Sequence, residues 1–288
     1  MHGSKHDCRD ITEASLTTMT EQELASWLAL RGQNVICHHG RYWRETYPGF
    51  YAASHPLARM SADEATRPRA LCWGFRSSLR EADASTANGS LPVHLLTDID
   101  TYVLQTRSPR CRNKLRNLRK QADIVALHQP DLLLEQGYDI LSSAHARNKY
   151  GNLPGRTTYQ KSIERYYASG RGLVLGGLVD GKLGGYLTSY AVGTTAYVDE
   201  VFLDTRYLNT HISLGLFFDW MQICRRNQEI REVVHGLHAR EAVGLCRYKE
   251  ELGLQVVHVP ARIWFAPFAG KVVKKLRPHV YYRLTGHD

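Results

Sequence analysis

Short apolar runs separated by turn signals predict a β region in the second half of the chain. The segment GLVLGGLVDGKLGGYLTSYAVGTTAYVDEVFLD carries Asp180-Gly181 and Gly193-Thr194 between its apolar runs. Dipeptides of this kind favour tight hairpin turns. Their spacing predicts three consecutive antiparallel strands, at about 172–179, 182–192 and 195–203.

Helical periodicity appears on both sides of this region. After the strands, apolar residues spaced by three and four positions predict a helix at about 210–227. Its expected buried face consists of Leu216, Phe217, Trp220, Met221, Ile223 and Cys224. Near the N-terminus, TEQELASWLALRG predicts an amphipathic helix that Thr20 caps.

Two further helices are expected just before the middle of the chain. One starts at Asp98 or Asp100 and runs through Leu104. The next carries Pro109 in its first turn, where proline is tolerated, and ends near Gln121. The second of these helices is strongly basic, with Arg110, Arg112, Lys114, Arg116, Arg119 and Lys120.

The remaining segments complete the expected order of elements. YDILSSAHARNKYG and TTYQKSIERYYASG predict helices that Gly151 and Gly170 would end as C-caps. Residues 35–88 predict small strands and loops. After the long helix, IREVVHGLHA predicts a strand, REAVGLCRYKEELG a short helix, and LQVVHVPARIWFAP the last strand or two. The ending KVVKKLRPHVYYRLTGHD predicts a basic amphipathic helix or an irregular tail.

Composition narrows the classes of protein and partner. The net charge of +9 favours anionic partners such as phosphorylated cofactors, RNA or headgroups, although a charge that only aids solubility explains it as well. The six cysteines form no CxxC pair, so neither a zinc ribbon nor a disulfide framework is indicated, and no metal is expected. Isolated thiols and the absence of an apolar leader or an eighteen-residue apolar run favour a cytoplasmic protein without a membrane span.

The order helix, helix, three-stranded meander, helix, strand, helix, strand resembles the GNAT acyltransferase fold. In that family the turn after the fourth strand binds the pyrophosphate of coenzyme A and follows the pattern V-x-P-x-Y-R-G-x-G-I-G. Placed without gaps on residues 203–213, the pattern matches at Tyr207 and Ile212 and loosely at Leu203. It fails at the proline, at the arginine and at all three glycines.

A closer resemblance is to the Fem-like branch, which includes peptidoglycan-bridge aminoacyltransferases and BioF2-like acetyltransferase domains. These proteins carry a basic helix S-x-x-x-R-x-x-[IL]-R-K-A, here SPRCRNKLRNLRKQA, and a late segment G-[LI]-x-x-[FY]-K-x-x-[FL]-G, here GLCRYKEELG. The likeness covers about residues 100–265. It implies an α/β fold with a mixed sheet flanked by helices, a GNAT-like acyltransferase domain at 106–288, and a degenerate GNAT-like half at 1–105.

The resemblance also implies where acyl transfer would occur. In this fold the fourth and fifth strands, here at 195–203 and in IREVVHGLHA, separate from each other. Backbone amides near Val201, Phe202 and Leu203 would then bind the acyl carbonyl and the pantetheine arm. Asp199 and Glu200 are adjacent on a strand and are expected to face opposite ways. Glu200 is the expected catalytic base, against the alternative that both are ordinary strand-edge acids.

Four further site candidates lie in the segments that follow the helix at 210–227. His235 is expected to act in catalysis and His238 to contact the substrate, because both end the fifth strand and imidazole titrates near neutral pH. Tyr248 and Lys249 occupy the aromatic–lysine pair of the Fem-like pattern, where the lysine could steady an anionic transition state or protonate a leaving group. The structural alternatives are satisfied strand-end histidines and a surface lysine beside a core tyrosine.

The turn at 209–213 holds the expected cofactor-binding residues Asn209, Thr210, His211 and Ser213. A helix N-terminus offers backbone N–H groups and a positive dipole end whether or not glycines precede it. Asn209 is the residue here that best tolerates a left-handed backbone. The alternative is that Asn209 or Thr210 only caps the helix.

Substrate contacts are expected from the basic helix and from the segment ARNKYGN. Arg112 and Arg116 could hold the phosphates of a tRNA acceptor stem or a nucleotide-linked substrate, or the helix could be a solvated one packed through Leu115 and Leu118. Arg147 and Tyr150 are expected to face the acceptor pocket.

These observations lead to three alternative functions. The first is an N-acyltransferase that moves an acetyl or acyl group from acyl-CoA to the amine of a small molecule or peptide by direct attack. The second replaces the thioester by aminoacyl-tRNA. The third is a non-catalytic GNAT-like module that binds RNA or protein. The sequence does not indicate the acceptor, the acyl group or the oligomeric state.

Overall fold

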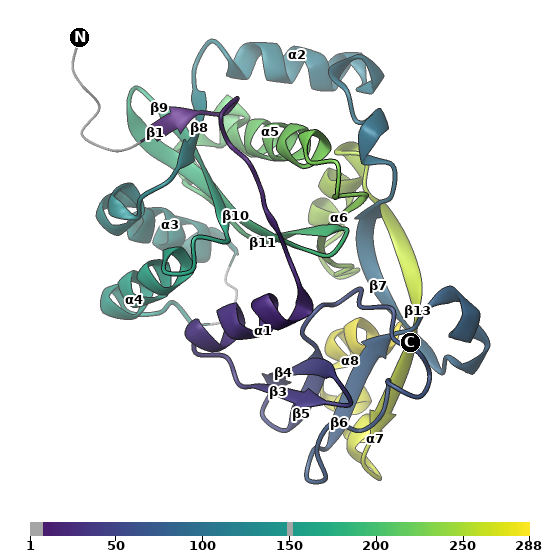
Figure 1. Cartoon of the computed structure of the whole chain (residues 1–288). Coiled ribbons are helices and arrows are strands. Elements are labelled where there is room, and N and C mark those ends of the chain that lie inside the picture. Colours follow the sequence, from purple (N-terminus) through teal and green to yellow (C-terminus); the bar gives the residue numbers. More distant parts are fainter. Residues whose placement is uncertain (1–7, 149–151) are drawn as a thin grey trace. The chain divides into compact units, whose positions relative to one another are not determined.

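The computed structural model describes residues 8–148 and 152–288, and the chain divides into two compact units (Figure 1). The first unit combines the N-terminal segment through Thr18 with Thr97–Val233, and the second combines Met19–Leu96 with Val234–Asp288. The fold class is α/β, with a mixed sheet flanked by helices, as predicted. The compact units divide the chain at other positions than the expected halves at 1–105 and 106–288, and each unit draws on two separate segments. The division into two GNAT-like halves stays a prediction.

The first unit is built on an antiparallel sheet. Its strands are β1 (Cys8–Asp10), β8 (Asp123–Leu127), β9 (Leu173–Val179), β10 (Lys182–Val192) and β11 (Thr195–Leu203), hydrogen-bonded in that order. β2 (Thr18–Met19) and β12 (Glu232–Leu237) both run from one unit into the other. The helices are α2 (Pro109–Leu118), α3 (Tyr138–Asn148), α4 (Arg156–Tyr167) and α5 (Ile212–Arg226), with 3₁₀ turns η2 (Ile99–Thr101), η3 (Leu104–Thr106) and η5 (Thr205–Thr210) and a π-helical turn η4 (Leu133–Gly137). Figure 1 shows α5 and α2 on one face of this sheet and α3 and α4 on the other.

The three predicted strands of the meander are confirmed to within a residue. Asp180 and Gly181 both have positive φ, 48° and 73°, as a two-residue hairpin turn of the I′ type requires. Gly193 has a φ of 54° in the second turn. These turn residues set the strand ends, which explains why the sequence placed them well.

The helix predicted from Asp98 or Asp100 through Leu104 is wrong. The chain forms two separate 3₁₀ turns there, closed by Tyr102 N–H to Ile99 O and by Arg107 N–H to Leu104 O. The segment is shorter than an isolated helix needs for stability, and the burial of Ile99 and Tyr102 at a spacing of three is satisfied by one turn.

The helices around the meander largely follow the predictions. α2 begins at Pro109, with Ser108 as its N-cap, and ends at Leu118 rather than Gln121. Gly170 has a φ of 63° and ends the turn after α4, whereas the expected C-cap Gly151 lies outside the described residues. All six predicted core residues of α5 are buried.

The close packing of α2 on α5 depends on one glycine. A Cβ atom built on Gly215 of α5 would lie 2.1 Å from Cδ2 of Leu118 on α2. Leu118 is itself fully buried, so it has little room to move away. Gly215 therefore lets α2 lie directly against the N-terminal half of α5.

The second unit contains a mixed sheet. Its strands, in order of pairing, are β7 (Gly89–Leu96), β13 (Gln255–Phe265), β6 (Gly74–Ser78), β5 (Phe50–Ala53), β4 (Arg41–Tyr47) and β3 (Val35–His38). The β5–β6 pair is parallel and the others are antiparallel. The helices are α1 (Glu21–Leu30), α6 (Val243–Glu251), α7 (Ala269–Leu276) and α8 (Pro278–Thr285), with a 3₁₀ turn η1 (Glu81–Thr86).

Sequence signals at both ends of the second unit are confirmed in part. Thr20 caps α1 through a full capping box with Glu23. The C-terminal segment forms two short helices, because Pro278 starts a new helix where the first one ends. LQVVHVPARIWFAP forms one long strand, β13, even though it contains Pro260.

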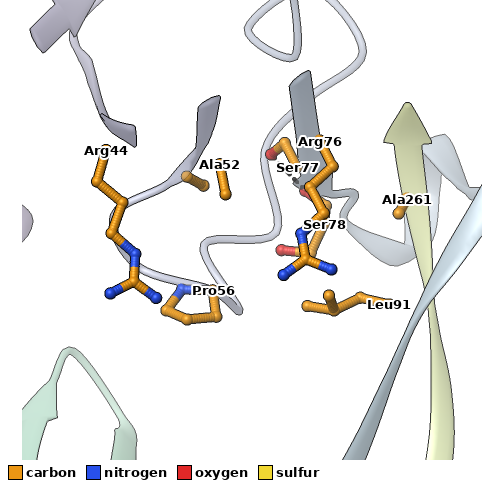
Figure 2. A pocket seen from close by; sticks show the side chains of 9 residues that line it. Arg44, Ala52, Pro56, Arg76, Ser77, Ser78, Leu91 and Ala261 are labelled. Atoms are coloured by element: carbon orange, nitrogen blue, oxygen red, sulfur yellow. Dashed lines mark hydrogen bonds between the residues drawn. The ribbon is translucent and has the colours of Figure 1, made fainter. Parts of the chain in front are cut away.

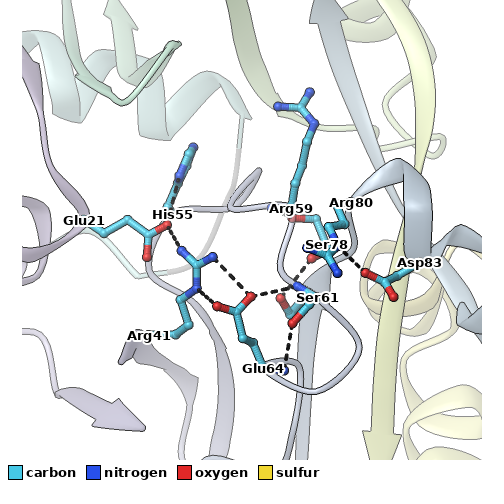
Figure 3. Close-up of polar contacts among 10 residues, drawn as sticks. Glu21, Arg41, His55, Arg59, Ser61, Glu64, Ser78, Arg80 and Asp83 are labelled. Atoms are coloured by element: carbon cyan, nitrogen blue, oxygen red, sulfur yellow. Dashed lines mark hydrogen bonds and ion pairs between the residues drawn. The ribbon is translucent and has the colours of Figure 1, made fainter. Parts of the chain in front are cut away.

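The carboxylate of Glu64 is held in a polar network of the second unit (Figure 3). Its Oε1 accepts from Arg41 Nε at 3.0 Å, and its Oε2 accepts from the Ser61 N–H at 2.8 Å. These bonds, the Arg41 bond first, lower the pKa of Glu64 to about 2. Ionised Glu64 is therefore stabilised by folding.

We expect Glu64→Gln to lower the free energy of unfolding at pH 6 by up to about 1 kcal/mol, because the side chain is a third exposed and its ion pair is screened. A depressed folded pKa gives stability that is present above the ordinary pKa of Glu and is lost as pH falls toward 2. The difference between variant and wild type should therefore vanish on acidification. Urea unfolding from pH 6 to pH 3 measures this, with exposed Glu81→Gln as the control; an equal effect of both variants would contradict it.

Candidate functional site

A side chain of α3 forms hydrogen bonds at the end of β11. Arg147 donates from Nη1 to Leu203 O at 3.1 Å and to Thr205 Oγ1 at 2.8 Å. The buried Asp204 carboxylate accepts the Arg206 N–H at 2.9 Å and starts η5. Arg147 therefore holds the chain where the strand leaves the sheet, and its expected contact with substrate stays a prediction.

The entry to α5 has an unusual backbone. His211 adopts a left-handed conformation, with φ 62° and ψ 25°, and is the N-cap of α5. Asn209, the residue here that best tolerates this conformation, does not adopt it; His211 does, at a position where the GNAT pattern has glycine. The left-handed residue separates η5 from α5 and turns the chain between the two helical segments.

No side chain caps the first turn of α5. Thr210 donates its hydroxyl to Tyr207 O at 2.6 Å, within the preceding turn. The interpretation that Asn209 or Thr210 only caps the helix is therefore wrong. Because the first N–H groups of a helix lack partners within it, this terminus can bind an anion.

A basic side chain from α2 lies near this terminus. Burial lowers the pKa of His211, and the nearby Lys114 ammonium lowers it further. Lys114 reaches this place because Gly215 allows α2 to pack closely. Ser213, half-buried in the first turn of α5, adds a hydroxyl. The helix end therefore combines a positive dipole end, a lysine and a hydroxyl.

β11 contains a bulge at its acidic pair. Val198 pairs with Ser189 and Glu200 with Thr188, so Asp199 is an extra residue. The Glu200 N–H donates to Thr188 Oγ1 at 3.1 Å, toward β10. A bulge interrupts the strict alternation on which the expected opposite orientation of the two acids rested.

The bulge also sets the direction of the amides that follow. Because the Glu200 N–H points toward β10, alternation directs the N–H groups of Val201 and Leu203 away from β10 and that of Phe202 toward it. The bond from Arg147 to Leu203 O agrees with this alternation. Val201 and Leu203 can therefore offer donors on that side of the strand, and Phe202 cannot.

Two buried tyrosines lie near Glu200. Burial raises the pKa of Tyr159 to about 12, and the Glu200 charge raises it as well, whereas the Tyr186 hydroxyl lowers it. The pKa of Tyr186 is well above its usual value, first through burial and then through Tyr159 and Glu200. Both phenols are therefore neutral at pH 7, and the exposed Glu200 carboxylate is the group here that can accept a proton.

The second unit brings together the late candidates. Lys249 is buried, and its Nζ donates to His235 O at 2.6 Å, so the interpretation of a surface lysine is wrong. Burial lowers the pKa of Lys249 to about 8. The pKa of His235 lies well below its usual value, through burial first and then through Lys249 and His94. Tyr248 is half-buried beside them in the sequence.

His238 lies in a cluster that the sequence did not predict. Its Nδ1 lies 2.7 Å from the Tyr282 hydroxyl, and its ring meets that of His94 edge to face with centroids 5.4 Å apart. The Cys246 thiol donates to Ala239 O at 3.2 Å. No sequence signal marks His94, which lies about 140 residues before its neighbours; Cys246 shares a helix face with Lys249 and could have been found from that spacing.

The basic helix has both local and long-range contacts. Arg112 Nη1 donates to Gln105 O at 3.2 Å, and Arg119 forms an ion pair with the buried Asp219 of α5 at 2.5 Å. Arg116 is exposed. Leu115 and Leu118 are buried, which confirms the predicted packing seam. Tyr150 lies outside the described residues.

A separate small pocket lies within the second unit (Figure 2). Arg44 and Arg76 line it together with Ser77 and Ser78, and no acidic residue lines it. Burial, with Arg44 nearby, lowers the pKa of Arg76 to about 10. Its polar lining is therefore cationic and hydroxylic.

The fold has close counterparts among solved structures. FemX superposes with a TM-score of 0.61 over 95% of this chain and 96% of its own, at 10% identity. The C-terminal DUF2156 domain of a putative lysylphosphatidylglycerol synthetase from Agrobacterium fabrum gives 0.60 over 93% of both chains, at 11% identity. The chain has a GNAT-like fold. L-PGS from Bacillus licheniformis is similar too, at 0.56 over 95% of this chain and 99% of its own, with 12% identity.

These likenesses span nearly the whole chain, and at this level of identity they establish the fold alone. No protein-family model matches the sequence. No curated protein matches it either. Within residues 8–148 and 152–288, none of the helices has both the length and the apolarity that crossing a membrane requires.

Proposed function

We propose that the protein is a GNAT-like N-acyltransferase that moves an acyl group from acyl-CoA to an amine. The observation that supports this most is the entry to α5, where a left-handed His211 leads into a helix without a side-chain cap and Lys114 lies nearby. Backbone N–H groups and a lysine at such a terminus suit a pyrophosphate. Ser213 adds a hydroxyl, and Asn209 and Thr210 lie in the turn η5 just before the helix.

In the proposed reaction the acyl carbonyl accepts from the N–H groups of Val201 and Leu203. The amine nitrogen attacks the carbonyl carbon, Glu200 accepts the proton that the amine loses, and the carbon–sulfur bond breaks. The leaving thiolate takes its proton from water. Lys249 and His235 belong to the second unit, where Lys249 Nζ donates to His235 O, and their catalytic roles stay a prediction.

Binding of acetyl-CoA tests the donor site. We expect wild-type protein to bind acetyl-CoA and Lys114→Glu to weaken binding by about tenfold or more, because the substitution places a carboxylate beside the pyrophosphate. Isothermal titration calorimetry measures this, with Lys120→Glu as the matched control on the exposed end of the same basic segment. No heat from folded wild-type protein at millimolar acetyl-CoA, or equal weakening by both variants, argues against the proposal.

A second donor, aminoacyl-tRNA, is favoured by two observations. Structures that match over nearly the whole chain include FemX and a domain of a putative lysylphosphatidylglycerol synthetase, and the latter name denotes transfer of a lysyl group to a lipid. Arg110 and Arg116 of α2 and Lys120 just after it are exposed and could hold RNA phosphates. A salt-sensitive gel shift with aminoacyl-tRNA that deacylated tRNA does not compete away would favour this donor over acyl-CoA.

A further inference from the structure

We propose that His94, His238 and Cys246 bind a zinc ion in the second unit. One potential ligand atom from each residue lies within 4.8 Å of the other two. The residues come from three elements: His94 from β7, His238 from the segment after β12, and Cys246 from the first turn of α6. A tetrahedral zinc site needs only a small closing movement of these side chains.

The burial of His94 points to a ligand. Its side chain is 0% exposed, and neither ring nitrogen has a hydrogen-bond partner in the described part of the chain. Buried polar side chains nearly always have a partner, because desolvation is costly without one. A metal ion would satisfy the nitrogen that faces His238 and Cys246.

His238 is already oriented as a metal ligand would be. Its Nδ1 and the Tyr282 hydroxyl lie 2.7 Å apart. With the proton on Nδ1, the ring donates to the tyrosine oxygen and presents the lone pair of Nε2. Ligating histidines usually have such a partner on their second nitrogen, which fixes the tautomer and the ring orientation.

The donor set selects the kind of ion. Two imidazole nitrogens and one thiolate suit zinc and other borderline ions, and they suit magnesium and calcium poorly. Three protein ligands leave one tetrahedral position for water. Cys246 loses its proton to bind, and its negative charge offsets part of the repulsion between the ion and the nearby Lys249 ammonium.

This site goes beyond the proposed acyl transfer, and it differs from the sequence-based expectation of no metal. That expectation rested on the absence of closely spaced cysteine pairs. The ligands here are separated by 144 residues between His94 and His238, which no motif spacing reveals.

Cobalt substitution of the full-length protein tests the site. We expect chelator-treated wild-type protein to bind one Co²⁺ per chain, with a thiolate-to-cobalt charge-transfer band and tetrahedral d–d bands. One equivalent of Zn²⁺ should displace the bound Co²⁺. Cys246→Ser should lose the charge-transfer band, whereas Cys37→Ser, which changes an exposed cysteine of the same unit, should keep it. Far-UV circular dichroism confirms that each variant is folded.

Tyr282→Phe provides a second measurement that does not remove a ligand. Loss of its contact with His238 should weaken zinc binding about 10- to 100-fold in competition with a chelator, and stoichiometry should stay at one. The proposal is overturned if folded wild-type protein binds no stoichiometric Co²⁺ or Zn²⁺ at micromolar concentration. It is equally overturned if Cys246→Ser keeps the charge-transfer band.

Discussion

Glu200→Gln is expected to lower kcat for acyl transfer by about 10²- to 10⁴-fold, the range typical for the loss of a general base. Glutamine keeps the shape of the side chain and its exposed position but cannot accept a proton at neutral pH. The affinity for acetyl-CoA should be nearly unchanged, because the donor anion is proposed to bind at the start of α5. Thiol release from acetyl-CoA in the presence of a panel of primary amines gives kcat, and titration calorimetry gives the affinity.

Asp199→Asn is the matched control, since it removes the same charge one residue away. The bulge makes Asp199 the extra residue of β11 in its register with β10, and Glu200 retains its place opposite Thr188. We expect a much smaller effect on kcat from this control. If Glu200→Gln turns over at the wild-type rate with an amine that wild type accepts, Glu200 is not the base.

Trp220→Ala is expected to lower the free energy of unfolding by about 3–5 kcal/mol, the usual cost of truncating a fully buried aromatic side chain. Trp220 is 0% exposed at the centre of the buried face of α5. Its ring packs against that of Phe217, with the two ring centroids 5.3 Å apart. The cavity would form beneath the helix that carries the proposed donor site. Urea unfolding followed by far-UV circular dichroism measures the change.

Two other variants calibrate this result. Trp220→Phe keeps most of the ring volume and should cost less than half as much. Arg225→Ala removes an exposed side chain of the same helix and its hydrogen bonds to Asp100 O and Gln222 Oε1, so about 1 kcal/mol or less is expected. A loss from Trp220→Ala no larger than that from Arg225→Ala would show that α5 is not held by its apolar face.

Local patterns predicted the elements well where the local chemistry is decisive. The Asp180-Gly181 and Gly193-Thr194 turns set the ends of the meander strands, and the apolar stripe of α5 identified its buried face. Thr20 capped α1 as expected. Turn residues act over two to four positions and periodicity over one helix, so both can be recognised without knowledge of the partner surfaces.

The same patterns were insufficient at the site. Asn209 has the better intrinsic tolerance for a left-handed backbone, yet His211 adopts it, because Asp204 and Thr210 close η5 and Ile212 is buried under the sheet. The bulge at Asp199 depends on pairing with β10. Lys114 lies near His211 through the packing of α2 against α5, which Gly215 permits by leaving room for Leu118.

The sequence by itself determined the α/β class, the meander, the long helix after it and the basic character of the segment before it. Those features follow from turn chemistry and periodicity, which are encoded in neighbouring residues. Only the tertiary structure decided that Lys249 is buried against His235 and that His94 joins His238 and Cys246. Contacts of that kind join residues far apart along the chain, and they form because strand pairing and helix packing bring separate segments to one place.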